Sequence, residues 1–205
     1  EVLLFSQGFS SAEQLAPKFV ALFSMAKESL SHQTHYDFGL RAMKSVLTNA
    51  GQLIRQRQIK EGEKREEIES KLLISSIVNA LFPKLLQHDL VRLQRVIDDV
   101  FPGVKPEEIT QTELLSLLHQ EAEKEGWIDS EIWVNKIIQL YYIQQISHGF
   151  MLVGPSASGK TSARTALLKV LSILDKQESE SYVINPKSVT KDTLYGALDP
   201  TTREW

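Results

Sequence analysis

Apolar residues recur at intervals of three and four positions through most of the first 149 residues, which is the spacing of one buried face of an α-helix. The first stretch opens after Ser10, with Glu13 three positions on, as in a capping box. Pro17 lies inside this stretch, so we expect a kink or a later start there. A second helix is predicted from about residue 36 to 50, with Gly51 as its C-terminal stop.

Further helices are predicted up to residue 149. The patterning runs from Ile68 to Pro83, from Leu90 to Phe101-Pro102-Gly103, from a capping-box spacing at Thr110 and Glu113 to Gly126, and from Asp129 or Ser130 to Gly149. Between residues 55 and 71, eleven of seventeen residues are charged, six basic and five acidic. With almost nothing apolar to bury, this stretch is predicted to be a solvated helix extension or a mobile insertion.

The pattern changes after Gly149. Phe150-Met151-Leu152-Val153 is wholly apolar and is typical of a strand buried on both faces, and Tyr182-Val183-Ile184 is predicted to be a second strand. A glycine-rich loop and an amphipathic helix lie between them, which predicts a right-handed βαβ unit. The fold class is therefore α/β overall, with a mostly helical N-terminal part. Two strands alone do not form a stable sheet, so we expect a piece of a longer protein or a sheet covered by the helical half.

Composition narrows the classes of function. The chain has 205 residues (23.2 kDa), 42% apolar and 24% charged, with a net charge of −3 and no cysteine. The weak negative charge argues against nucleic acid as the main ligand, and the lack of cysteine excludes disulfides, thiol catalysis and cysteine zinc sites. No apolar run approaches the length of a membrane span, so no membrane partner is expected. The five histidines form no metal-ligand spacing.

One motif carries specific chemistry. Residues 154–161 match G-x-x-x-x-G-K-[ST] at every fixed position: Gly154, Pro155, Ser156, Ala157, Ser158, Gly159, Lys160 and Thr161. The glycines allow a tight turn whose N–H groups point at phosphate oxygens, and the following helix adds its positive dipole end. Lys160 is predicted to bridge the outer phosphates and the hydroxyl of Thr161 to ligate Mg²⁺. The motif predicts bound ATP or ADP with magnesium.

Binding does not imply hydrolysis. No apolar run after Thr161 ends in an acidic residue that would hold the metal ion for catalysis, and Asp98 and Asp99 fall in register with a helix. The tryptophans and tyrosines between residues 127 and 142 are expected in a core or interface, although the segment 141–148 is an alternative candidate for contacting adenine. Ala157 stands where glycine is commoner, which costs energy if that position needs a positive φ. By pattern alone, Arg41 is expected to pair with Asp37 across one helical turn.

Four segments, in this order, resemble the dynein heavy chain. They are His35-Tyr36-Asp37-Phe38-Gly39-Leu40-Arg41, the loop 154–161, Ile184-Asn185-Pro186-Lys187, and the run from Lys191 to Trp205. The resemblance covers nearly the whole chain and is weakest over about residues 52–130. Gly154-Pro155-Ser156 and Lys191-Asp192 are closer to cytoplasmic than to axonemal forms.

The resemblance implies a place in a ring of AAA+ modules of a minus-end-directed microtubule motor ATPase. Residues 1–130 would be the helical lid of the first module, with 52–71 as a charged insertion. Residues 131–205 would start the α/β part of the second module, truncated before its acidic strand. Arg41 would be a sensor-2 arginine for the first module's ATP, and the 154–161 loop would hold a structural nucleotide.

The implied partners are the other modules and the linker of the same chain, the microtubule through a stalk elsewhere, a second heavy chain, and accessory chains, in the cytoplasm and cytoskeleton. This fragment alone is expected to be inactive. The alternatives are an independent small P-loop protein, a structural module with a vestigial loop, and an axonemal dynein.

Overall fold

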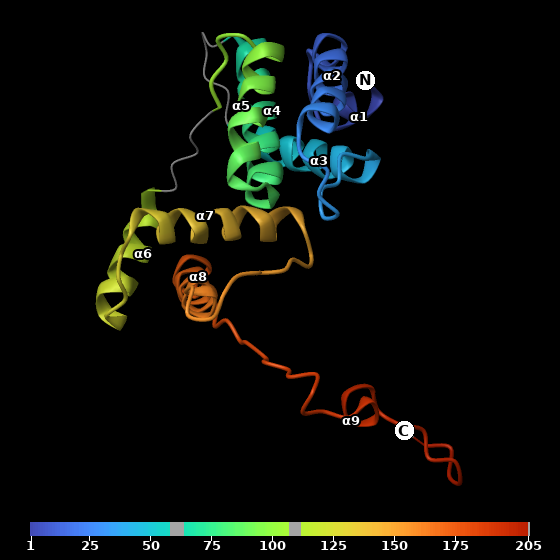
Figure 1. Ribbon diagram of the computed structural model, residues 1–205, viewed down its shortest axis with the longest axis vertical. Coiled ribbons are helices and arrows are strands. Elements are labelled where there is room, and N and C mark those ends of the chain that lie inside the picture. The colour runs from blue at the N-terminus through green and yellow to red at the C-terminus, as the bar shows by residue number, and fades with distance from the viewer. Residues whose placement is uncertain (58–63, 107–111, 205) are drawn as a thin grey trace.

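All regular secondary structure in the described part of the chain is helical. The computed structural model describes residues 1–57, 64–106 and 112–204. The helices are α1 (Val2–Ser6), α2 (Ala12–Ser29), α3 (Leu40–Gln56), α4 (Arg65–Leu81), the short 3₁₀ helix η1 (Phe82–Lys84), α5 (Gln87–Val100), α6 (Thr112–Glu125), α7 (Glu131–Ile146), α8 (Lys160–Asp175) and α9 (Lys191–Tyr195) (Figure 1).

Two hydrophobic clusters organise these helices. The first is formed by α1 to α5, and the second by α6, α7 and α8. Helix α7 runs across the end of the first group and contacts α3 and α4, while Ile146 at its C-terminus packs against the first cluster (Figure 1). Beyond α8 the chain extends away from both clusters towards α9 (Figure 1).

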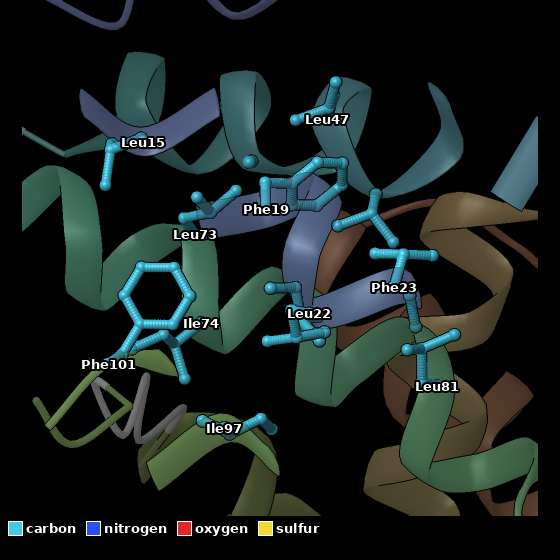
Figure 2. Close-up of a cluster of buried hydrophobic side chains, with 14 of the residues drawn as sticks. Leu15, Phe19, Leu22, Phe23, Leu47, Leu73, Ile74, Leu81, Ile97 and Phe101 are labelled. Carbon is cyan, nitrogen blue, oxygen red and sulfur yellow. The ribbon is translucent and has the colours of Figure 1, made fainter. Parts of the chain in front are cut away.

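The first cluster is built from the stripes that the spacing predicts. Phe19 and Phe23 of α2 pack with their ring centroids 4.8 Å apart and share this cluster with Leu73 and Ile74 of α4 (Figure 2). Ile97 of α5 closes the cluster from a third side (Figure 2). Full burial of one such side chain stabilises the fold by about 1.5–3 kcal/mol, so this cluster holds the helical half together.

Several predicted helix limits are confirmed. Helix α5 ends at Val100, directly before the Phe101-Pro102-Gly103 stop. Helix α7 starts after Ser130, whose hydroxyl oxygen accepts a hydrogen bond from the Trp133 N–H at 3.3 Å. Helix α6 ends before Gly126, but the predicted cap at Thr110 lies outside the described residues.

The expectation for Gly51 needs correction, and of the two outcomes expected at Pro17 the later start is excluded. Helix α2 starts at Ala12 and continues through Pro17, so no later start occurs. Helix α3 starts at Leu40 and runs past Gly51 to Gln56. A Cβ atom on Gly51 would lie 2.2 Å from Oε1 and 2.8 Å from Cβ of Gln7. Gly51 therefore allows the end of α1 to approach α3 closely, and it does not terminate the helix.

Residues 58–63 of the charged stretch lie outside the described residues. On either side of them the predicted helix extension is present, but the burial of Ile68 and Glu69 was not predicted. Residues 65–71 form the first turns of α4, and Ile68 and Glu69 are buried there. The Glu69 carboxylate accepts hydrogen bonds from the N–H groups of Ser10 (2.9 Å) and Ser11 (2.8 Å), from the Ser11 hydroxyl, and from Nε of Arg65 (2.9 Å). The Ser11 side chain thus binds Glu69 and does not cap α2.

A second buried carboxylate lies on α5. Asp89 is fully buried and accepts hydrogen bonds from the N–H and hydroxyl of Ser31, from the Tyr36 hydroxyl and from Arg92. Burial by itself raises the pKa of Glu69 and of Asp89, but the hydrogen bonds outweigh burial and hold each pKa below its ordinary value. Both side chains are therefore ionised in the folded protein.

The two predicted strands are not formed, whereas the predicted helical part of the fold is confirmed. Residues 150–153 and 182–184 are extended and exposed, with Val153 88% and Tyr182 82% accessible, and no strand lies beside either run within the described residues. A strand requires a neighbour about 4.8 Å away to satisfy its backbone groups. The apolar side chains of these two runs are thus exposed in this structure.

We expect Glu69→Gln to lower the free energy of unfolding by about 2 kcal/mol at pH 7, because the charge-assisted hydrogen bonds are lost. A lowered folded-state pKa stabilises the fold above the ordinary value of 4.5, and this contribution disappears as the pH falls through the folded-state pKa. The difference between wild type and variant should therefore shrink towards pH 3. Urea unfolding at several pH values measures it, and a difference independent of pH would contradict the ionised carboxylate.

Candidate functional site

The loop 154–161 joins the extended run 150–153 to the N-terminus of α8. Gly159 is the N-cap residue of α8 with φ 80°, and Ala157 has φ 61°. Both positions are left-handed, a conformation that glycine adopts freely and alanine adopts at a cost. The condition on which a cost at Ala157 was expected, a positive φ, is thus met. The turn leads directly into the first turn of α8, where backbone N–H groups have no acceptor within the helix.

The Lys160 ammonium folds back over the loop. Its Nζ donates to the carbonyl oxygens of Gly154 (2.9 Å) and Pro155 (2.5 Å) and to the Ser158 hydroxyl oxygen (3.2 Å). These three acceptors hold the positive charge at the mouth of the turn. An anion at the loop would compete with the carbonyls for the same protons, and a multiply charged phosphate is the stronger acceptor.

Helix α7 contacts the end of the loop at Gly159. A Cβ atom on Gly159 would lie 3.4 Å from both Cδ1 and Nε1 of Trp133, so the indole is in direct contact with the start of α8. Trp133 packs edge-on against Trp127 at 5.7 Å, and Lys169 of α8 lies 5.8 Å above the Trp127 ring. Lys169 also pairs with Glu125, and this hydrogen bond lowers the pKa of the Glu125 carboxyl. The predicted core and interface role of the tryptophans is confirmed.

A cavity of about 920 Å³ adjoins the loop. It is lined by the loop itself, by the run 150–153, and by α7 residues that include Trp133, Lys136 and Leu140. Its volume falls within the range of roughly 300–1,000 Å³ typical of small-molecule sites. The phosphate-loop residues and the aromatic support therefore face one common space.

Metal ligands are sparse around this cavity. In the described parts of the chain no group of three or more histidine, cysteine or acidic side chains could hold a metal ion. Thr161 is exposed at the second position of α8, and Asp98 and Asp99 lie on α5 as the helical register predicts. A magnesium ion at the loop would thus take the Thr161 hydroxyl together with phosphate and water oxygens, which suits its preference for retaining most of its waters.

Arg41 lies elsewhere. It is the second residue of α3, is exposed, and lines a groove of about 220 Å³ with Lys44 and with Ile146 of α7. No ion pair joins it to Asp37 in the described structure, so the simple pairing expected from the pattern is wrong. Asp37 precedes the helix, and its Oδ1 accepts the Gly39 N–H at 2.8 Å. Arg41 and the 154–161 loop line separate cavities.

Residues 1–161 match the family model described as the hydrolytic ATP binding site of the dynein motor region. The chain is also 42% identical to the cytoplasmic dynein heavy chain of Paramecium tetraurelia over 211 residues, 41% to that of Dictyostelium discoideum over 218, and 44% to that of Caenorhabditis elegans over 214. The chain belongs to the dynein heavy-chain family. Each alignment includes all of this chain and 5% of the relative, so the chain spans about one twentieth of the heavy chains it matches.

Membership of the dynein heavy chains agrees with the resemblance of the four sequence segments. Both Arg41 and the 154–161 loop fall inside the part of the chain that matches the ATP-binding region of the dynein motor. Among the described residues, no helix is both long enough and apolar enough to cross a membrane.

We expect Ala157→Gly to raise the free energy of unfolding by up to about 1 kcal/mol, because glycine relieves the left-handed strain. Ala157→Val should lower it by about 1–2 kcal/mol, since a β-branched residue is strongly disfavoured at positive φ. Denaturant unfolding of the three proteins measures the order. A valine variant as stable as the glycine variant would contradict the observed loop geometry.

Proposed function

We propose that this dynein heavy-chain segment joins two AAA+ modules of an ATP-driven motor. Residues 1 to about 130 form the helical lid of one module, including the charged segment 52–71, and residues from about 131 begin the α/β part of the next. Helix α6 packs in the second cluster with α7 and α8, and α7 also contacts α3 and α4 of the first part. The observation that carries the proposal is the complete phosphate-loop motif at the N-terminus of α8, with Ala157 and Gly159 in left-handed conformations.

The loop binds the phosphates of ATP or ADP. The backbone N–H groups of residues 154–161 and the dipole of α8 attract the polyanion, and the Lys160 ammonium shifts from the loop carbonyls to the outer phosphates. Thr161 places its hydroxyl on the accompanying Mg²⁺. These are the ordinary roles of such residues in a phosphate loop, and the geometry at the start of α8 supports them.

The nucleotide at this loop has a structural role, as the resemblance to the second module of the dynein heavy chain implies. No aspartate or glutamate is among the described residues that line the cavity beside the loop, and Asp98 and Asp99 lie exposed on α5. A bound nucleotide contacts both the loop and the first turn of α8, and these contacts stiffen the connection between the modules.

Arg41 acts on a different nucleotide. Its exposed guanidinium at the start of α3 extends from the lid towards the ATP of the module to which that lid belongs, as a sensor-2 arginine. Its position inside the match to a hydrolytic ATP-binding region supports this role. A positive charge there distinguishes ATP from ADP by their charge and couples the difference to the position of the lid.

In the complete heavy chain, this segment takes part in minus-end-directed movement along microtubules, with the other modules, the linker, a second heavy chain and accessory chains as partners. The relatives named as cytoplasmic favour cytoplasmic dynein, working in the cytoplasm and cytoskeleton, over an axonemal form. Their coverage of the whole chain favours a heavy-chain segment over an independent small nucleotide-binding protein.

Lys160→Ala should weaken Mg·ATP binding at this loop at least tenfold, because a charge-assisted contact worth about 1.5–3 kcal/mol is lost. Calorimetric titration of the folded protein measures the affinity. Lys169→Ala is the matched control, since Lys169 is on the same helix but pairs with Glu125, and its affinity should remain that of the wild type. Unchanged affinity in Lys160→Ala would refute the phosphate site.

Arg41→Ala in the full-length heavy chain should lower ATP turnover at least tenfold, because a charge contact to the phosphates is removed from the hydrolytic site. Arg55→Ala, at the opposite end of the same helix, serves as the control and should retain turnover. Steady-state ATPase assays with and without microtubules make the comparison. Wild-type turnover and stimulation in Arg41→Ala would reject the sensor role.

A further inference from the structure

Asp89 occupies an unusual place in the helical part of the chain. It lies in the first turn of α5 with 0% of its surface accessible, among apolar residues of the first cluster. An ionised carboxylate in such a place is costly unless its oxygens are saturated by hydrogen-bond donors. Donors reach it from its own helix, through Arg92 at 3.1 Å, and also from a segment more than fifty residues earlier in the chain.

That segment is the connection between α2 and α3. The Ser31 N–H, at 3.3 Å, and the Ser31 hydroxyl donate to Asp89, and the Tyr36 hydroxyl donates to its Oδ2 at 2.9 Å. The Tyr36 oxygen in turn accepts the Leu86 N–H at 2.8 Å, directly before α5. One carboxylate and one phenol therefore attach both ends of the connection to the start of α5.

The attachment continues to the start of α3. The Tyr36 ring packs edge-on against Phe38, with centroids 6.0 Å apart. Asp37 then accepts the Gly39 N–H at 2.8 Å, and Gly39 is the N-cap residue of α3. Arg41 follows two residues later. Hydrogen bonds of Ser31, Tyr36 and Asp37 and the ring contact of Phe38 thus hold the stretch of chain between the Asp89 carboxylate and the backbone of Arg41.

We infer that Asp89 is a positioning residue for Arg41. Its buried carboxylate fixes the connection between α2 and α3, and with it the point at which α3 starts and from which the guanidinium extends. This inference rests on the proposed role of Arg41 in ATP turnover. According to this inference, Arg41 is misplaced when Asp89, a residue on another helix, is lost. A displacement of about 1 Å at a catalytic site can lower the rate about 100-fold.

Glu69 provides a matched comparison within the same cluster. It is also a buried carboxylate saturated by backbone and hydroxyl donors and by an arginine on its own helix. Its donors, however, come from Ser10 and Ser11, between α1 and α2, and not from the segment that leads to Arg41. Loss of either carboxylate should destabilise the lid, but only loss of Asp89 should disturb Arg41.

The experiment compares Asp89→Asn, Tyr36→Phe and Glu69→Gln in the full-length heavy chain. Asp89→Asn and Tyr36→Phe should lower ATP turnover at saturating ATP about three- to tenfold, the effect of losing one hydrogen bond in the attachment. Glu69→Gln should lower the thermal midpoint as Asp89→Asn does and yet retain wild-type turnover. If Asp89→Asn fails to fold, Tyr36→Phe decides alone, because it removes a single oxygen atom.

Each variant is then combined with Arg41→Ala. If Asp89 acts through Arg41, Asp89→Asn should cause little further loss of turnover in that background. An equal fold loss with and without Arg41 would overturn the inference, as would Asp89→Asn and Tyr36→Phe behaving like Glu69→Gln. Wild-type turnover in Arg41→Ala alone would instead reject the proposed sensor role, so the two failures are distinguishable.

Discussion

Hydrogen bonds to two buried carboxylates hold the connections of the helical bundle formed by α1 to α5, and the rest of this bundle depends on them. The apolar faces of α2, α4 and α5 pack against one another, but this packing constrains only the helices and not the segments that connect them. Those segments carry backbone N–H groups that must find acceptors when they are covered. Glu69 supplies acceptors to the turn before α2, and Asp89 supplies them to the connection after it. An apolar core of the same volume could not define where α2 starts or how the chain enters α3.

Helix α7 connects this bundle to the phosphate loop. Its C-terminal Ile146 packs against the first cluster, and Trp133 near its N-terminus contacts Gly159 at the start of α8. The helix is therefore shared between two cores and has apolar side chains around most of its circumference, which suits a helix packed on more than one side. Helix α7 thus contacts the start of α8 at one end, and at the other end its Ile146 packs on the first cluster and lines the groove that contains Arg41.

The predictability of each feature follows from the range of the interactions that form it. The stripes of α2 and α5, the Ser130 cap and the Phe101-Pro102-Gly103 stop are local, and they were predicted correctly. Gly51 was interpreted wrongly, and the burial of Glu69 in the charged stretch was not predicted, because their environments are made by distant residues: Gln7 approaches Gly51, and Ser10 and Ser11 saturate Glu69. Asp89 was overlooked, although one signal was present. It lies four residues before Leu93 on the apolar face of its helix, where a carboxylate implies buried donors.

The phosphate loop and the two apolar runs on either side of it also differ in whether local or distant interactions form them. The left-handed residues, the turn and the N-terminus of α8 require only each other and the indole of Trp133, so the loop takes its form without a sheet. The runs at 150–153 and 182–184 have equally clear strand character, yet a strand exists only beside another strand. Phosphate binding depends on N–H groups, a helix dipole and an ammonium group, all of which belong to the local structure. The candidate chemistry of this chain is therefore specified by residues adjacent in sequence, whereas the sheet that would bury Met151 and Val153 depends on strand partners that the described residues do not supply.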